Sequence, residues 1–402
     1  MITFRKISAE GAGKLIVQYL REHCAEPEFD ARCEKEPEGQ RHDDGDRMTT
    51  YYTGRDGRGV WSPQMGDRIA DSLGIDLTQQ PSDEALARLF EGKRADNGEK
   101  WAGDHAKRTI SAIDFTAAPD KSVTLAAELA TTETEKALIW HAIHQANDRA
   151  MSFIADEVGV ARRGKGGMGS LEEGEVGWVS FRHHTARPVM KIQDGLKGET
   201  AVVEIPVPGD PHAHIHNLMF NAVATESGHL GSLDSKRITQ LTAHMFGAYF
   251  QAELARELRS LGIKVNVDDR GKAVLLDAIP KEAREHFSKR SKQATQTAKD
   301  FVKAQGGNWA AMSADQKFKI LHQTNLRFRE AKYTGTNELE IWREEMKALG
   351  WKHETVLEDA HYAPKTAEER REHAYTVASK MLSEEFRTAA VLDRDALRTH
   401  AA

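Results

Sequence analysis

Residues 213–223 read Ala-His-Ile-His-Asn-Leu-Met-Phe-Asn-Ala-Val, and this stretch decides how the rest of the sequence is interpreted. It is apolar enough for one buried strand, and His212, His214 and His216 stand two residues apart at its start. Side chains of a strand alternate between two faces, so these three histidines project the same way, about 6.5 Å apart. Two of them can therefore meet one metal ion, while a third ligand has to come from a neighbouring strand.

A second histidine pair, His183 and His184, follows a strand predicted at residues 177–182. A histidine there would complete a site of three imidazoles with open positions, which a catalytic metal needs. The alternative is a set of surface or hydrogen-bonded core histidines, but five histidines in two strand-borne clusters favour the metal site. The pattern does not fix the metal, because imidazoles suit Zn, Mn, Ni or Cu as well as a Mg-type ion.

Strands come singly and in hairpins along the chain, with helices between them. Further strands are predicted at residues 2–8, 110–116, 263–267 and 272–276. Helices are predicted at residues 9–22, at 236–261 and through most of the charged sequence beyond 279. Two more are predicted to begin at Lys121, directly after Asp120, and after a capping-box pattern at residues 132–135. Residues 161–176 are interpreted as a Gly-rich loop. This order indicates an α+β fold, with a mainly antiparallel sheet covered by helices.

The composition limits the classes of function. The 402 residues carry a net charge of −6, which excludes a binder that holds nucleic acid by bulk charge alone but allows a local basic groove. Residues 21–50 contain ten acidic and five basic residues, about −5 in all, and are interpreted as a flexible, solvated insertion. The remainder of the chain is therefore close to neutral. No phosphate-binding loop of the G-x-x-x-x-G-K-[ST] type occurs.

Cellular location is inferred from what the sequence lacks. No run of about 18 apolar residues is present, and the N-terminal stretch has no apolar core of a signal peptide. Cys24 and Cys33 are too few for a disulfide scaffold and do not have metal-ligand spacing. We therefore expect a cytoplasmic protein with no membrane partner.

Five short blocks, in this order, resemble those of a known family, the MobF-class conjugative relaxases of the HUH endonuclease superfamily. Tyr51-Tyr52 with Trp61 resembles the family's YY…W block, and residues 113–123 (IDFTAAPDKSV) resemble DLTFSAPKSV. Residues 181–187 (FRHHTAR) resemble RH(E/D)TSR, residues 210–216 (DPHAHIH) resemble DPQLHTH, and residues 287–291 (FSKRS) resemble a later FSKRS block. Each block is weak alone, but their shared order over roughly residues 1–360 is specific.

The resemblance implies a fold and an activity. It implies a central, mainly antiparallel five-stranded sheet flanked by helices, with a helical C-terminal segment that closes over the DNA. It also implies site- and strand-specific nicking of single-stranded DNA at a plasmid transfer origin. In that reaction a tyrosine attacks a phosphodiester, which leaves a 5′-phosphotyrosine and a free 3′-OH, and a later transesterification can rejoin the ends. A divalent metal, Mg or Mn by expectation, with Zn, Ni or Cu as alternatives, draws charge from the phosphate.

The resemblance also assigns roles to residues. His183, His214 and His216 match the metal triad, while His212 and His184 fall where the family has other residues and are not first-choice ligands. Asp114 matches the acid that orients a metal-bound histidine or takes the tyrosine proton; capping or a simple ion pair is its alternative role. Lys121, at a helix start, is expected to activate the tyrosine or meet a phosphate.

Three tyrosines are candidates for the nucleophile. Alignment puts Tyr19 near the family's primary tyrosine and Tyr51, next to Tyr52, near the second, with the acidic insertion as an unusually long spacer. The alternative for Tyr19 is a core position on an amphipathic helix, and for the other two it is strand packing. A tyrosine with a pKa of about 10 is mostly protonated at pH 7, so a base or cation nearby has to activate it.

Basic residues near these blocks are expected to bind DNA. Residues 281–304 carry seven basic and three acidic residues, a local charge of +4, although such a run is often only a solvated helix face. Nearby aromatic side chains can stack unpaired bases. The predicted DNA contacts are Lys121, Arg162, Arg163, Arg182, Arg187, Lys289 and Arg290.

These inferences give a domain plan and a set of rival functions. Residues 1–278 are predicted as the catalytic core, 279–365 as a helical DNA-clamping segment, and 366–402 as a helical tail or linker. The expected partners are transfer-origin DNA, accessory conjugation proteins and a secretion-system coupling protein, with passage into a recipient cell. The rivals are a rolling-circle initiator or transposase, a non-catalytic DNA-binding protein with a structural metal, and a metallohydrolase of small molecules.

Overall fold

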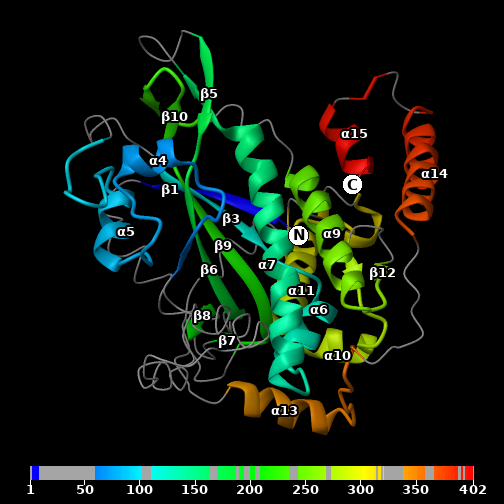
Figure 1. Ribbon diagram of the computed structural model, residues 1–402. Coiled ribbons are helices and arrows are strands. Elements are labelled where there is room, and N and C mark those ends of the chain that lie inside the picture. Colours follow the sequence, from blue (N-terminus) through cyan, green and yellow to red (C-terminus); the bar gives the residue numbers. More distant parts are fainter. Residues whose placement is uncertain are drawn as a thin grey trace.

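Residues 213–220 of the predicted strand lie at the centre of a five-stranded antiparallel sheet in the computed structural model (Figure 1), whereas Val223 begins a strand of a second sheet. The sheet order is β1-β3-β9-β6-β2, formed by Ile2–Ser8, Ile110–Ala117, Pro211–Phe220, Trp178–Thr185 and Val60–Trp61. The structure describes residues 2–8, 59–101, 110–162, 170–186, 190–193, 200–203, 209–234, 243–268, 273–313, 316–317, 320, 338–357, 366–387, 391–392 and 394–401. The predicted α+β class and the central antiparallel sheet are confirmed.

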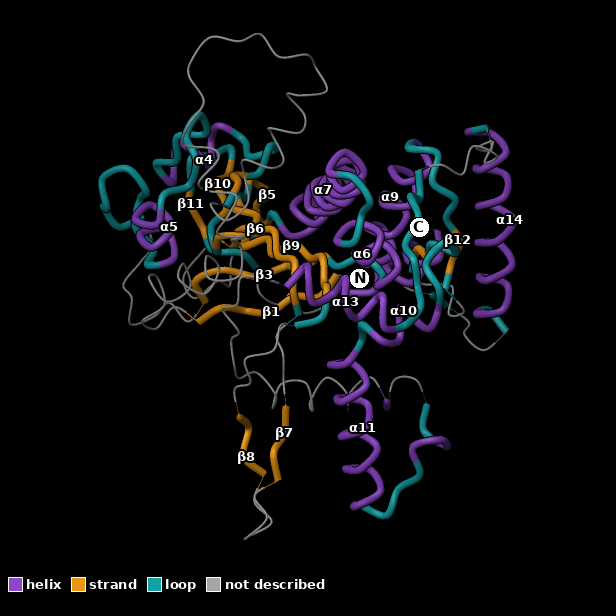
Figure 2. Tube along the Cα trace, turned by 90° about the horizontal axis from the view of Figure 1, so that it is seen from below, coloured by secondary structure: helices purple, strands orange, loops and turns teal. Residues whose placement is uncertain are grey.

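Helices cover one whole face of this sheet. They are α6 (Lys121–Glu128), α7 (Glu133–Val158) and α9 (Ala243–Ser260), and Figure 2 shows them together on one side of the strands. Odd-numbered residues of β9, such as Ile215 and Met219, pack into the core that these helices form with the sheet. Even-numbered residues Leu218 and Phe220 belong instead to a second core, shared with α4 (Asp67–Leu73) and α5 (Asp83–Phe90). The two-residue period of β9 therefore separates two environments.

Helix starts follow the predicted caps. Asp120 accepts the N–H of Ser122 at the start of α6, and Thr132 accepts the N–H of Glu135 at the start of α7. The predicted capping box is only half formed. The Glu135 carboxylate accepts hydrogen bonds from Thr131 and, far along the chain, from Thr355 and Val356. Glu135 thus ties the segment after α13 (Glu338–Ala348) to the start of α7.

A small second sheet was not predicted as such. Its order is β11-β10-β5-β4, formed by Leu230–Gly231, Val223–Thr225, Leu171–Glu175 and Val160–Arg162. The predicted loop at 161–176 is therefore wrong at both ends, because β4 and β5 lie within it. The sequence of β5 is Leu-Glu-Glu-Gly-Glu, which has no apolar alternation to mark a strand. The helices α4 and α5 also went unpredicted.

The remaining elements lie mostly towards the C-terminus. The predicted hairpin is confirmed in a shorter form, with β12 at Asn266–Val267 and β13 at Val274–Leu275. A second hairpin, unpredicted, consists of β7 (Met190–Gln193) and β8 (Thr200–Val203), and Figure 2 shows it projecting from the same side as α11 (Lys289–Ala304). The other C-terminal elements are α10 (Lys281–His286), η3 (Trp309–Ala311), α14 (Ala367–Glu385) and α15 (Arg394–Ala401).

Helix α15 is joined to the core by charge. Arg394 and Arg398 both donate to the largely buried carboxylate of Glu157 on α7, each at 2.6 Å. Among the described residues, no helix combines the length and apolar character that crossing a membrane requires.

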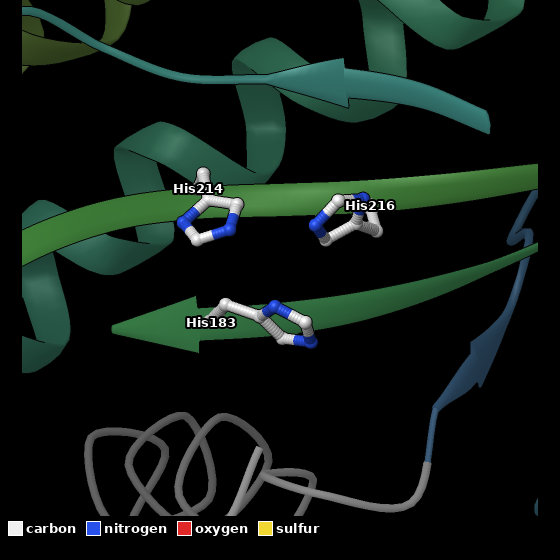
Figure 3. A group of neighbouring side chains, drawn as sticks. All are labelled: His183, His214 and His216. Carbon is white, nitrogen blue, oxygen red and sulfur yellow. The ribbon is translucent and has the colours of Figure 1, made fainter. Parts of the chain in front are cut away.

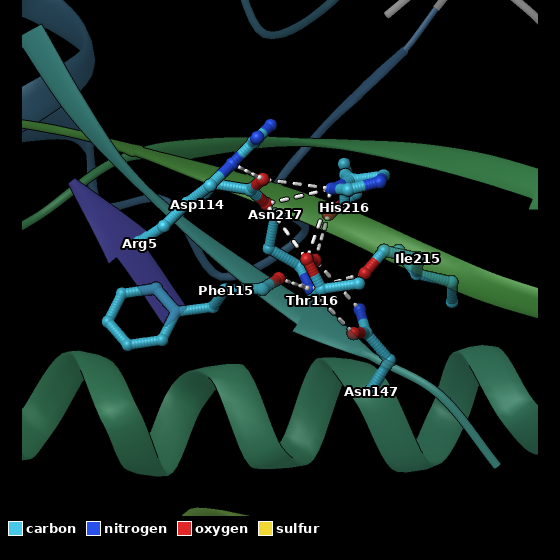
Figure 4. Close-up of polar contacts among 9 residues, drawn as sticks. Arg5, Asp114, Phe115, Thr116, Asn147, Ile215, His216 and Asn217 are labelled. Atoms are coloured by element: carbon cyan, nitrogen blue, oxygen red, sulfur yellow. Dashed lines mark hydrogen bonds and ion pairs between the residues drawn. The ribbon is translucent and has the colours of Figure 1, made fainter. Parts of the chain in front are cut away.

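A buried amide pair joins the sheet to α7. Asn217 on β9 and Asn147 on α7 donate to each other's side-chain oxygens at 2.8 and 3.0 Å, and Asn217 also donates to the carbonyl of Phe115 (Figure 4). Ser180 on β6 donates to the same Asn217 oxygen. One side chain thus connects three strands and a helix in a fully satisfied network.

Removing one partner should be costly. In an Asn147→Ala variant the Asn217 amide loses a partner inside the core, so we expect a loss of about 1–3 kcal/mol in the free energy of unfolding, measured by urea denaturation. The control is Asn97→Ala, whose side chain accepts one bond at an exposed turn and whose loss should cost less than about 0.5 kcal/mol. Equal effects of the two substitutions would contradict this role.

Candidate metal centre

Three histidines meet on the face of the sheet opposite α7. His183 comes from β6, and His214 and His216 come from β9, where His183 and His214 are direct cross-strand partners (Figure 3). One ring nitrogen of each lies within 4.8 Å of the others, and all three residues are buried. They are the only group of this kind within the part of the chain that the structure describes. This is the predicted triad.

Asp114 on β3 fixes the orientation of His216. The Nδ1 of His216 lies 2.9 and 3.0 Å from the two carboxylate oxygens of Asp114, with Thr116 Oγ1 at 3.1 Å (Figure 4). An ionised carboxylate only accepts, so Nδ1 carries the hydrogen and Nε2 is left with a lone pair for a metal. This carboxylate–histidine arrangement is the usual support of a metal ligand.

Arg5 on β1 completes the support of Asp114. Its Nε donates to Asp114 Oδ2 at 2.9 Å, and the Asp114 side chain is fully buried. Burial alone would raise the pKa of the Asp114 carboxyl, but the charges and hydrogen bonds of His216 and Arg5 outweigh it and hold that pKa below its usual range. Asp114 is therefore ionised. Sequence reasoning missed Arg5, because only the register of β1 against β3 brings it opposite Asp114.

His214 is oriented by the backbone. Its Nδ1 lies 2.7 Å from the carbonyl oxygen of His212, which can only accept, so its Nε2 is also free of hydrogen. Burial and the neighbouring His216 lower the pKa of His214 to about 3, so the ring is neutral near pH 7, as a metal ligand must be. The His212 ring stacks on His214 with 4.7 Å between centroids but is not part of the triad.

The donor set fits a divalent metal ion. Two of the three imidazoles are held in the tautomer that leaves Nε2 available. Three nitrogen ligands leave positions open, which is the pattern of catalytic rather than structural sites. The ion would be held by His183, His214 and His216.

The other face of β6 explains two predicted residues. His184 points away from the triad and bonds through Nδ1 to the buried Glu128 carboxylate at 2.9 Å. Arg182 is 8% exposed and stacks 3.8 Å from the centroid of the Trp140 ring on α7. Adjacent strand residues alternate in direction, so both side chains lie on the helix-covered face. This position does not favour the predicted DNA contact of Arg182.

The two predicted lysines are engaged with protein groups. Lys121 is partly buried and its ammonium donates to the carbonyl of Pro211. The Lys289 ammonium lies 2.7 Å from Glu345 and 3.4 Å from Asp210. Both ammonium groups thus already have acceptors within the protein.

The remaining predicted residues cannot be located. Tyr19, Tyr51, Tyr52, Arg163 and Arg187 lie outside the described residues. For Arg162 and Arg290 the backbone is described and the side chain is not. Their roles stay predictions.

Comparison with protein families gives one model that spans most of the chain. The family described as TrwC relaxase matches residues 15–349. No curated protein sequence matches the chain.

Several solved structures share the fold. A copper-bound complex of the conjugative relaxase TrwC with oriT DNA has a TM-score of 0.61 and 20% identity, over 88% of this chain and 100% of that chain. A metal-free TrwC–oriT complex has a TM-score of 0.60 and 20% identity, with the same coverage of both chains. TrwC bound to a 27-mer DNA with the recognition hairpin and cleavage site has a TM-score of 0.58 and 21% identity, over 88% of this chain and 100% of that chain. At this identity the likeness establishes the fold.

Removal of the Asp114 charge should weaken metal binding. Asp114→Asn replaces one acceptor oxygen by an amide donor and removes the negative charge that His216 Nδ1–H and Arg5 share, so we expect a metal dissociation constant about 10–100-fold higher. Titration calorimetry with Mn²⁺ measures it. The control is Asp96→Asn, an aspartate paired with Arg94 at the surface, whose affinity should match the wild type. An unchanged affinity of the Asp114 variant would contradict the assigned role.

Stability should also depend on pH through Lys121. Burial lowers the pKa of Lys121 to about 8, against the opposing carboxylates of Asp210 and Asp120. An unfolded lysine keeps its proton to about pH 10.4, so above pH 8 the unfolded chain binds more protons and the folded state gains stability as pH rises. Between about pH 8 and 10 wild type should gain up to roughly 3 kcal/mol relative to Lys121→Met in urea unfolding. If the free energies of unfolding of the two proteins changed in parallel with pH, this role of Lys121 would be refuted.

Proposed function

The chain belongs to the TrwC relaxase family, and on this premise we propose that it nicks one strand of DNA at a plasmid transfer origin and transfers that strand. The observation that carries the proposal is the three-histidine centre, with His216 held by Asp114, on the sheet that the family model spans. The TrwC structures of the same fold are complexes with oriT DNA, in copper-bound and metal-free forms. This combination favours DNA chemistry over small-molecule hydrolysis.

The proposed reaction is a transesterification by tyrosine. A tyrosine hydroxyl loses its proton and its oxygen forms a bond to phosphorus. The bond from phosphorus to the 3′ oxygen breaks, and that oxygen takes up a proton as the free 3′-OH. The 5′-phosphate stays on the tyrosine as an ester, so the reverse reaction can rejoin strands. A metal ion held by His183, His214 and His216 would supply Lewis-acid polarisation of the phosphate oxygens.

The residues of the chain have distinct tasks in this scheme. His183, His214 and His216 bind the ion, and Asp114 orients His216. Both oxygens of Asp114 already accept hydrogen bonds inside the sheet, which favours this orienting role over that of the base for the tyrosine. Tyr19 is proposed as the primary nucleophile and Tyr51, or its neighbour Tyr52, as the second.

DNA contacts are proposed for basic residues on the projecting elements. Lys292, Lys299 and Lys303 are exposed along α11, which stands out from the body in Figure 2. Arg162, Arg163, Arg187 and Arg290 remain candidates from the sequence. We assign residues 1–278 to the catalytic core, 279–365 to DNA clamping, and 366–402 to a helical tail or linker.

Finer assignments rest on the family. We propose Mg²⁺ or Mn²⁺ as the ion in the cell. Single-stranded transfer-origin DNA is the proposed substrate, and accessory conjugation proteins and a secretion-system coupling protein are proposed partners. The proposed place of action is the cytoplasm, with passage to a recipient cell.

Covalent capture of DNA tests the proposal. The protein is incubated with Mn²⁺ and single-stranded oligonucleotides that tile the DNA flanking its own gene, and products are separated on a denaturing gel. We expect a protein–DNA adduct that is lost in Tyr19→Phe and in His216→Ala, because one lacks the nucleophile and the other a metal ligand.

Two controls define the outcome. Tyr375→Phe changes a tyrosine that is 76% exposed on α14 and should leave the adduct unchanged. If Tyr19→Phe retains full adduct formation, the choice of Tyr19 is wrong, and Tyr51→Phe and Tyr52→Phe then identify the nucleophile. No adduct with any oligonucleotide would reject the enzymatic function.

A further inference from the structure

Three residues at the start of β9, which precede His212, His214 and His216, make hydrogen bonds to several other elements. Gly209, Asp210 and Pro211 are buried and lead into β9. The two-strand ladder between β6 and β9 becomes irregular here, since its register shifts between His183 and Thr185. One backbone hydrogen bond, from the Ala186 N–H to the Asp210 carbonyl at 2.9 Å, still joins the end of β6 to this segment. Contacts with other elements add to it in determining where the start of β9 lies.

Each residue of this tripeptide bonds to a different element. Trp342 on α13 donates its Nε1–H to the Gly209 carbonyl at 2.9 Å. The Asp210 carboxylate accepts the backbone N–H of Lys289, the first residue of α11, at 2.6 Å, and lies 3.4 Å from the ammonium of the same lysine. Lys121 on α6 donates to the Pro211 carbonyl. We call residues 209–211 the bracket.

The helices that hold the bracket also hold each other. Glu345 on α13 accepts from the Lys289 ammonium at 2.7 and 2.8 Å and from His286 on α10 at 2.7 Å. The helices α10, α11 and α13 therefore act on the bracket as one connected group. This group makes hydrogen bonds to the residues leading into the triad strand at Asp210 and Gly209.

The bracket lies one residue from a group that orients a metal ligand. The His212 carbonyl, which follows Pro211, accepts the Nδ1–H of His214 at 2.7 Å. A shift of the bracket would change the position of the carbonyl that orients the His214 ring. Loss of such an orienting partner typically weakens metal binding 10–100-fold.

We propose that the bracket makes the metal affinity of the triad depend on the positions of α11 and α13. Asp210, Lys121 and Trp342 are then positioning residues for His214. The inference rests on the proposed function only in taking the three histidines as metal ligands. Because α11 is also a proposed DNA contact, DNA and metal binding should favour each other through the bracket, by thermodynamic reciprocity.

Metal affinity without DNA tests this directly. Mn²⁺ binding is measured by titration calorimetry in the full chain, alongside the melting temperature. Asp210→Ala removes the acceptor of the α11 N-terminus, and we expect a dissociation constant about 10-fold higher. Asp210→Asn keeps an acceptor oxygen and should recover most of the affinity. Trp342→Phe keeps an aromatic ring but removes the donor to Gly209, and should weaken binding about 3-fold.

A matched variant separates positioning from general stability. Glu157→Ala also removes a largely buried carboxylate that joins a C-terminal helix to the core, but far along α7 from the triad. It should lower the melting temperature and leave the Mn²⁺ affinity within about twofold of wild type.

The outcomes distinguish the two proposals. If the Asp210 and Trp342 variants have lower melting temperatures but bind Mn²⁺ with the affinity of wild type, the bracket has no positioning role. Should Asp210→Ala fail to fold, Asp210→Asn and Trp342→Phe decide the question by the same criterion. If wild type binds no Mn²⁺, or binds it equally well after His214→Ala, the metal centre itself is wrong and the bracket proposal falls with it.

Discussion

The alternation of side chains along β9 is the constraint on which the rest of the structure depends. This strand is central in the sheet, so both of its edges pair with neighbouring strands and its two faces meet different environments. Its odd positions have to be buried against α6, α7 and α9, and its even positions carry His214 and His216 before they join the second core at Leu218 and Phe220. A shift of register by one residue would exchange these sets and place imidazoles in the helix-covered core. Fold and metal centre are therefore specified by the same residues.

Buried charge on both faces of the sheet is compensated locally. On the triad face Asp114 is matched by Arg5 and His216, and on the helix face Glu128 is matched by His184 and by the indole N–H of Trp140. Burial would raise the pKa of the Glu128 carboxyl, but His184 and nearby cations outweigh it and keep that pKa low. Neighbours on β6, His183 and His184, thus serve opposite faces. His183 belongs to the candidate metal triad, and His184 anchors the strand to α6 and α7.

Features that depend on residues only a few positions apart could be predicted from the sequence. Histidines two apart, the cap residues Asp120 and Thr132, and the apolar runs of β3 and β9 each follow a local rule, and the structure confirms them. The contact of Arg5 with Asp114 and the stacking of Arg182 on Trp140 depend on pairings across more than forty residues, which no local pattern encodes. The strand β5 was missed because it is polar and partly exposed. Lys289 was predicted to bind DNA from the local charge and the family resemblance, and only the tertiary structure brings Glu345 and Asp210 to it.

The central claim is that the face of β9 and β6 opposite α7 binds one divalent metal ion through three histidines and leaves positions open. Anomalous diffraction from crystals of the full chain grown with Mn²⁺ tests this most directly. We expect a single peak within bonding distance of ring nitrogens of His183, His214 and His216, with the remaining positions occupied by solvent. A peak elsewhere, or a fourth protein side chain that closes the coordination shell, would contradict it.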